Sequence, residues 1–285
     1  MKLDRMGVLL LLPGLALLLF LLVLPLVNTL LVSFKLFTPG QIGAAANAPF
    51  TWQNYLQLFN HAYLYYFFQT FWISFIATAI ALIVGFPIAY IVARLPTGWK
   101  RKLLVSFLVM VMFLSALVRV YSLALTFGPV GFLMPVARSL GINPNGGLMI
   151  ELITIAGLLH YVIPMSALVL IGTIQNINPR LTDAAEALGA PRWKAHLTVT
   201  VPMAKKGLVE AFLISYTLCI SAFVIPMILG RGRLLFVTNL IFNRFSLVAD
   251  YPSGAAMAVV MVVVSLVLVY AVTRFAYREP QGDAR

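Results

Sequence analysis

The sequence contains few charged residues for its length. Only 10% of its 285 residues are Asp, Glu, Lys or Arg, whereas a soluble globular domain usually carries about 25%. Its single cysteine, Cys219, excludes an intramolecular disulfide and a cysteine metal cluster. Three histidines, His61, His160 and His196, are far apart and lack the spacing of metal ligands. The chain therefore cannot cover a water-facing surface, and no metal site is expected in it.

Motifs for enzymatic chemistry are missing as well. No G-x-x-x-x-G-K-[ST] loop occurs, so the chain cannot cradle the phosphates of ATP in that way. No Ser/His/Asp arrangement can be argued from the sequence. We therefore expect a protein that is not itself an enzyme and binds no cofactor of its own.

Long apolar runs dominate what is present. Hydrophobic residues make up 62% of the chain, and a membrane-spanning helix needs about 20 mostly apolar residues. The first run is longer than the core of a signal peptide, so we interpret it as a retained span. The sequence predicts an all-α membrane protein, a single transmembrane domain over residues 1–285 with six spans: 7–33, 65–93, 103–127, 148–173, 208–229 and 253–275.

The basic residues are distributed unevenly between the connections. Of the 20 lysines and arginines, 14 fall at the termini and in the second and fourth connections, and five fall in the other three. Because cytoplasmic segments carry the excess of Lys and Arg, both termini and the long fourth connection are predicted to be cytoplasmic. This distribution also argues against nucleic acid as a partner, since the charges do not form one contiguous patch.

The fourth connection, residues 178–205, is long and polar where a turn would suffice. Asn178 followed by Pro179 is typical of a helix start, and Gly189 is a suitable stop because it tolerates positive φ. One narrow face of this helix carries small or apolar side chains, Leu181, Ala184, Ala185 and Leu188. The alternative is an amphipathic helix on lipid headgroups, but two alanines bury little area. A protein groove suits small residues better.

This connection resembles the EAA signature of ABC importer permeases. The matching residues are Asp183-Ala184-Ala185, Gly189 and Val199-x-Val201-Pro202, with Asp for the usual Glu and Val for Ile and Leu. The chain is most similar to the spermidine/putrescine-type permease group, on segments 50–55, 118–121 and 251–256. Shortly after segment 118–121, Leu123 stands where a Trp is usual.

The resemblance implies a type I ABC importer permease fold in the bacterial inner membrane, with cytoplasmic coupling helices. It implies that the ATP-hydrolysing subunit docks on Asp183, Ala184, Ala185, Leu188, Gly189 and Pro202. The implied partners are a second permease subunit, identical or homologous, two ATP-binding subunits that use ATP and magnesium, and a periplasmic solute-binding protein. Membrane lipid surrounds the assembly.

Four residues are candidates for the translocation pathway: Arg119, Tyr121, His160 and Ala222. Arg119 interrupts an apolar run, where a charge is costly unless it faces a polar cavity or partner. His160 lies inside a span and serves either the pathway or a helix–helix hydrogen bond. Ala222 occupies a position at which related permeases often carry an acid, and a polyamine route should present carboxylates. The sequence therefore favours an anionic or zwitterionic organic solute, although a partner permease could supply the acids.

Two other functions fit part of the sequence. An ion-gradient-driven secondary transporter usually needs intramembrane carboxylates, or broken helices in two repeats. A membrane scaffold without transport would explain the fourth connection but not Arg119. Retention of an ATPase in mild detergent separates the importer from both alternatives.

Overall fold

A computed structural model describes residues 5–40, 43, 47–128, 131–132, 134–139, 141, 143 and 145–276. Apart from one isolated bridge between Lys35 and Phe50, the regular secondary structure of these residues is helical. In the described part of the chain, four helices are long and apolar enough to cross a membrane. They are α1 (Arg5–Ser33), α3 (His61–Arg94), α7 (Gly147–Gln175) and α14 (Tyr251–Ala276).

The third and fifth expected spans are each divided into two helices. Residues 103–127 correspond to α4 (Trp99–Phe113) and α5 (Ala116–Phe127), which meet at 88° and count as a fifth span if taken together. Residues 208–229 correspond to α11 (Lys205–Ile220) and α12 (Val224–Leu229). The 16 residues of α11 are fewer than a span usually needs. The count of six spans therefore stays a prediction.

The chain divides into two compact units, and α3, α13 (Val237–Ser246) and α14 each contribute residues to both. The first unit comprises Met1–Tyr65 and Leu240–Val264. In it, α1 ends beside the short helix α2 (Gln53–Leu58), because the buried Asn54 amide donates to the carbonyls of Ser33 and Lys35 at 2.8 and 2.9 Å. These two bonds satisfy carbonyls that the end of α1 leaves free.

The start of α14 is also held within the first unit. The buried carboxylate of Asp250 accepts a hydrogen bond from the Ser253 amide at 3.0 Å and lies 3.4 Å from the Arg244 guanidinium of α13 (Val237–Ser246). Arg244 also donates to the hydroxyl of Tyr63. A carboxylate at a helix N-terminus is favoured by the free amides there.

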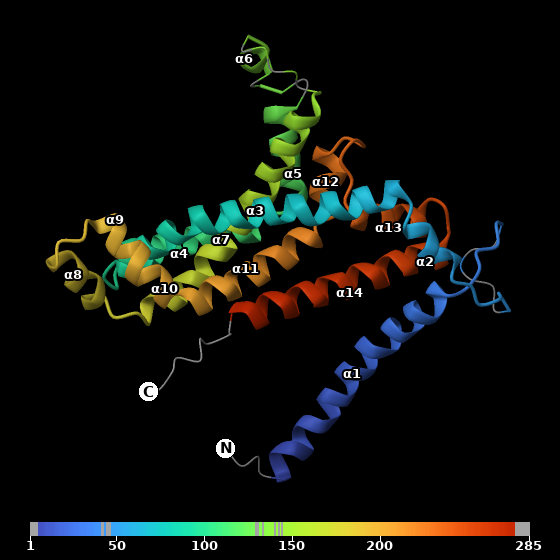
Figure 1. The fold of residues 1–285 in the computed structure, drawn as a ribbon, viewed down its shortest axis with the longest axis horizontal. Coiled ribbons are helices and arrows are strands. Elements are labelled where there is room, and N and C mark those ends of the chain that lie inside the picture. Colours follow the sequence, from blue (N-terminus) through green and yellow to red (C-terminus); the bar gives the residue numbers. More distant parts are fainter. Residues whose placement is uncertain are drawn as a thin grey trace, which may run out of the picture. The chain divides into compact units, whose positions relative to one another are not determined.

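The second unit, Tyr66–Asn239 with Ser265–Arg285, holds the main core (Figure 1). Helices α3, α7 and α11 pack closely, since small residues lie where they meet. A Cβ added at Gly85 of α3 would lie 2.5 Å from the Ser166 hydroxyl of α7, and that hydroxyl donates to the Ala81 carbonyl across the contact at 3.2 Å. Such close approaches and interhelical hydrogen bonds hold helices together in lipid.

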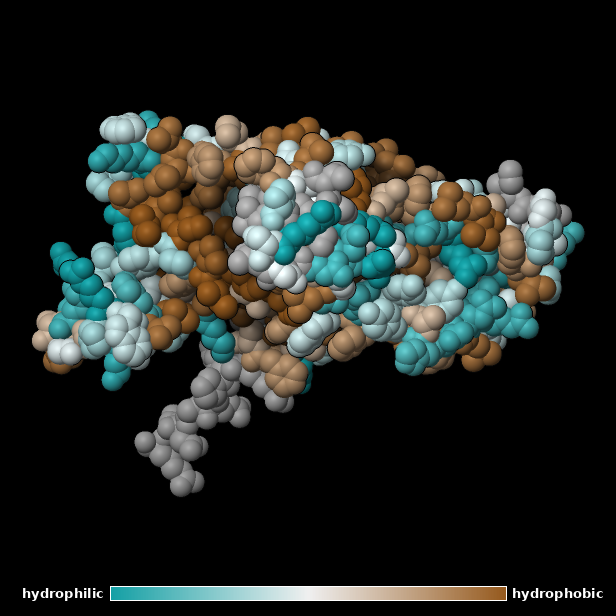
Figure 2. All heavy atoms as spheres, turned by 90° about the horizontal axis from the view of Figure 1, so that it is seen from above, coloured by the Kyte–Doolittle hydropathy of each residue, from teal (hydrophilic) through white to brown (hydrophobic). Residues whose placement is uncertain are grey.

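The connection between α7 and α11 forms a helical cap at one end of the second unit. It contains α8 (Arg180–Ala187), α9 (Arg192–Ala195), the π-helix η1 (His196–Thr200) and α10 (Val201–Met203). Figure 1 shows α8 and α9 together at the end where α3 gives way to α4. In Figure 2, hydrophilic residues gather at that end, and hydrophobic residues lie next to them. The fourth connection is thus a polar end of an apolar bundle.

Candidate functional site

The bend between α4 and α5 is closed by Arg119. Its Nη2 lies 2.9 Å from the carbonyl oxygens of both Val111 and Leu114, and 3.4 Å from that of Met112. The last carbonyls of a helix have no intrahelical donor and carry its negative partial charge. Arg119, at the beginning of α5, therefore satisfies the free carbonyl groups at the end of α4.

The break between α11 and α12 is satisfied in a similar way. Pro226 has no amide hydrogen, so it cannot pair with the Ala222 carbonyl four residues earlier. The Thr238 hydroxyl donates to that oxygen at 2.7 Å, and the Asn239 amide donates to the Phe223 carbonyl at 3.0 Å. Irregular backbone at membrane depth persists only where such partners or a cavity exist.

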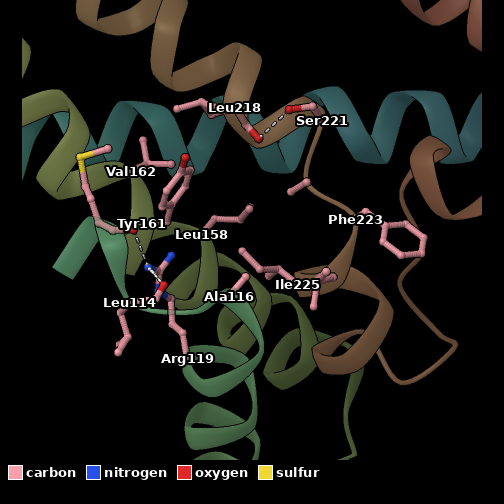
Figure 3. Close-up of a pocket in the computed structure, with 13 residues that line it drawn as sticks. Leu114, Ala116, Arg119, Leu158, Tyr161, Val162, Leu218, Ser221, Phe223 and Ile225 are labelled. Carbon is pink, nitrogen blue, oxygen red and sulfur yellow. Dashed lines mark hydrogen bonds between the residues drawn. The ribbon is translucent and has the colours of Figure 1, made fainter. Parts of the chain in front are cut away.

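A cavity of about 390 Å³ lies between the two breaks and α7. Figure 3 shows the side chain of Arg119 directed toward Tyr161 at its wall, with Leu218 and Ser221 of the α11 end across from them. Its lining residues are Met112, Leu114, Ala116, Arg119, Leu158, Tyr161, Val162, Leu218, Ser221, Ala222, Phe223, Val224 and Ile225. Discontinuous helices of this kind form the substrate sites of many transporters.

Among the described residues that line this cavity, Arg119 carries the only formal charge. Its side chain is 5% exposed, and its guanidinium carbon lies 5.1 Å from the centre of the Tyr161 ring. Its Nε is buried without a hydrogen-bond partner in the described structure. Arginine keeps its charge in proteins, and in a weakly polar wall that charge acts over several ångströms. The cavity is therefore suited to a negatively charged group rather than a cation.

The structure brings two of the four pathway candidates together. Arg119 and Ala222 line the same cavity from opposite breaks. Tyr121 lies on α5 with an exposed side chain, and His160 is exposed on α7; neither lines the cavity. Tyr161 was missed by sequence reasoning, although an aromatic residue able to pack on Arg119 is the type of neighbour that a costly buried charge calls for.

The second candidate site is the exposed surface of α8. The Asn178 side chain accepts from the Arg180 amide at 3.1 Å, which caps the helix start. Asp183, Ala184 and Leu188 are exposed, and Leu188 is 91% exposed. Trp193 is exposed as well, so two large apolar side chains face solvent at this polar end.

The segment after α8 returns the chain to the membrane helices. Gly189 has φ of +92°, the conformation expected at its position. Ala185 is half-buried, and the Ala190 amide bonds back to its carbonyl at 3.1 Å, which closes the helix end. Pro202 is exposed within α10, just before α11 begins. The residues of the EAA-like signature thus occupy one continuous segment at the polar end of the second unit.

Comparison with known proteins gives one family over most of the chain. Residues 85–278 match the model of the binding-protein-dependent transport system inner membrane component. The spermidine/putrescine transport system permease protein PotB of Haemophilus influenzae is 28% identical over 224 residues, 78% of each chain. The protein of the same name from Escherichia coli strain K12 is 26% identical over 225 residues, 78% of this chain and 82% of the relative.

Solved structures share the fold. One is the bacterial alginate ABC transporter in complex with an alginate pentasaccharide-bound periplasmic protein. A chain of it superposes with a TM-score of 0.73 at 17% identity, over 94% of this chain and 93% of its own length. A second structure, of a bacterial ABC transporter involved in the import of the acidic polysaccharide alginate, gives the same TM-score at 16% identity. At these identities the similarity concerns the fold alone, and it confirms the all-α membrane fold expected from the sequence.

Proposed function

Because the chain belongs to the family of binding-protein-dependent transport system inner membrane components, we propose that it imports a small anionic or zwitterionic organic solute. The chain is the permease subunit of an ABC importer, and ATP hydrolysis takes place in separate subunits. We infer the solute class from the cavity between the two broken helices. Arg119 lines it, and Ala222 stands where an acid would attract a polyamine.

The proposed assembly has four further components. A second permease subunit completes the membrane part, and one of the two ATP-binding subunits docks on the α8 surface around Leu188. A periplasmic solute-binding protein delivers the solute on the opposite face. ATP and magnesium would act in the ATP-binding subunits. The secondary-transporter alternative explains the broken helices, but it gives no role to an exposed leucine at the polar end.

The solute class can be tested by uptake into vesicles that contain the purified complex. We expect the complex to retain an ATPase in mild detergent. We also expect ATP-dependent uptake of labelled glycine betaine, with which succinate should compete better than spermidine or putrescine does. Ala222→Asp should weaken competition by succinate, because it places a carboxylate in the cavity lined by Arg119. Ala222→Ser, which is polar but uncharged, serves as the matched control.

Three outcomes would contradict this proposal. Saturable, ATP-dependent uptake of spermidine that organic anions do not compete would exclude the proposed solute class. Identical competition profiles for Ala222→Asp and Ala222→Ser would show that the cavity is not part of the translocation pathway. Uptake that follows an ion gradient, with no ATPase retained, would favour the secondary transporter.

For orientation, we propose six spans with both termini in the cytoplasm, on the basis of the distribution of Lys and Arg. Thr97, Arg192 and Arg233 are exposed, so cysteines there can react. In a Cys219→Ser background, an impermeant thiol reagent added to spheroplasts should label Arg233→Cys alone. Thr97→Cys and Arg192→Cys should react only after permeabilisation. Labelling of either from outside would exclude this orientation.

A further inference from the structure

Helix α8 is held to the rest of the protein by one buried side chain. Of its residues only Thr182 is buried, at 3% exposure. Its hydroxyl lies 3.2 Å from the Thr200 hydroxyl at the end of η1, and both oxygens are buried. Because Gly189 follows α8 in a conformation that side chains rarely adopt, the backbone on that side forms a turn rather than a rigid continuation. The Thr182–Thr200 contact is thus a buried lateral attachment of α8, in addition to the exposed ion pair between Glu186 of α8 and Arg192 of α9 at 3.6 Å.

A chain of contacts continues from Thr200 to α3. The Nδ1 atom of His196 lies 3.2 Å from the Thr200 hydroxyl, so that hydroxyl bridges His196 and Thr182. The His196 ring packs edge-on against Tyr90 of α3, with ring centres 4.5 Å apart. His196 and Thr200 mark the two ends of η1, and single π-helical turns occur often at functional sites.

A second set of contacts, made by Arg94, also joins α3 to the chain that leads into α8. The guanidinium of Arg94, at the end of α3, lies 5.4 Å from the centre of the Tyr90 ring. Its Nη1 donates to the Ile177 carbonyl at 3.0 Å, three residues before α8 begins. The end of α3 is therefore joined to α8 through His196 and Thr200 and, independently, through the chain that enters α8.

Helix α3 connects these contacts to the wall of the cavity. Its residues Ile73, Ala77 and Ala81 belong to the same buried cluster as Leu158 and Ile225, which line the cavity. Close-packed interiors transmit displacement rather than absorb it. A shift of α8 that is passed to α3 can therefore reach the side chains around Arg119.

We propose that Thr182, Thr200 and His196 are positioning residues that make α3 follow α8 when the ATP-binding subunits move. This inference rests on the proposed function, because it requires that those subunits dock on α8. None of the three residues belongs to the exposed docking surface: Thr182 and Thr200 are buried and His196 is half-buried. They act behind that surface, so docking and transmission can be separated by experiment.

The test measures solute transported per ATP hydrolysed, in vesicles that contain the full complex. Thr182→Val and Thr200→Val keep the branched shape and remove the hydroxyls. We expect each to retain the ATP-binding subunits and to hydrolyse ATP, while transport per ATP falls roughly fivefold, within the range seen for residues that couple distant sites. His196→Phe keeps a ring against Tyr90 but loses the hydrogen bond, and should behave like Thr200→Val.

Two controls separate transmission from simple destabilisation. Thr198→Val changes a threonine of the same η1 turn that is exposed and bonds only to the Lys194 carbonyl at 2.8 Å; its transport per ATP should equal that of the wild type. The double variant Thr182→Val/Thr200→Val should be no worse than Thr200→Val alone, because Thr200→Val already removes the contact with Thr182.

The outcomes distinguish this linkage from the proposed function. A wild-type complex that retains no ATPase would contradict the proposed function itself. A coupled wild type together with unchanged transport per ATP in Thr182→Val and Thr200→Val would overturn the linkage. Loss of the ATP-binding subunits from those variants would also overturn it, since the threonines would then shape the docking surface rather than act behind it.

Discussion

Replacing Leu188 with glutamate is expected to release the ATP-binding subunits from the purified complex and to abolish transport, while the permease still inserts and folds. Leu188 is 91% exposed, so the change removes no contact inside the chain. In the assembled complex it would place a charge in an apolar groove. Truncation of a hot-spot side chain at the centre of an interface costs about 2 kcal/mol or more, so the affinity should fall at least roughly 30-fold.

The matched control is Leu247→Glu in the first unit. Leu247 is likewise exposed, at 75%, and the proposed orientation puts it on the periplasmic side. The measurement is the amount of ATP-binding subunit that copurifies, relative to the permease, in detergent. Normal copurification of Leu188→Glu, or equal loss from both variants, would show that α8 is not the docking surface.

The backbone at Gly189 should make a separate contribution to the same docking. Its φ of +92° costs a β-branched residue about 1–3 kcal/mol, whereas Asn tolerates positive φ far better. A Cβ at this position would meet nothing within 4 Å, so strain rather than collision sets the effect. Gly189→Val is therefore expected to weaken copurification more than Gly189→Asn does, and Ala185→Asp should weaken it through charge.

The α8 region shows what local sequence signals can predict. The Asn178 cap and the positive φ of Gly189 both follow from side-chain chemistry within a few residues, and both are present. The contacts made by Thr182, His196 and Thr200 could not be foreseen in the same way. They depend on how η1 folds back onto α8 and on which residue of α3 lies behind it, and a threonine in sequence does not indicate its partner.

Of the two helix breaks at the cavity, one can be predicted from local sequence and the other cannot. Pro226 signals the break before α12, because a proline removes one helical hydrogen bond. No Pro or Gly lies near Leu114 and Ser115, where α4 ends, so that bend carries none of the usual sequence signals. Arg119 marks it only once the structure is known. The sequence shows that Arg119 is an unusual charge within an apolar run, but it does not show that carbonyl oxygens at the end of α4 are its partners.

Arg119→Ala is expected to lower both thermal stability and transport. Three carbonyl oxygens at the end of α4 would lose their donor, and a buried polar group left unpaired costs about 1–3 kcal/mol. Removal of the buried charge offsets part of this cost. A net loss of about 2 kcal/mol corresponds to a fall of roughly 4–8 °C in Tm for a domain of 150–250 residues. Tm can be measured in detergent by fluorescence.

Arg119→Lys separates the structural role of this side chain from its charge. Lysine keeps the positive charge but lacks the planar guanidinium that bonds to several carbonyls at once. We expect its Tm to fall nearly as far as that of Arg119→Ala, while the KM for an anionic solute such as succinate stays near the wild-type value. In Arg119→Ala the KM should rise at least about tenfold, the equivalent of 1.4 kcal/mol. Equal KM values in all three proteins would show that Arg119 only closes the bend between α4 and α5 and that its charge plays no part in solute selection.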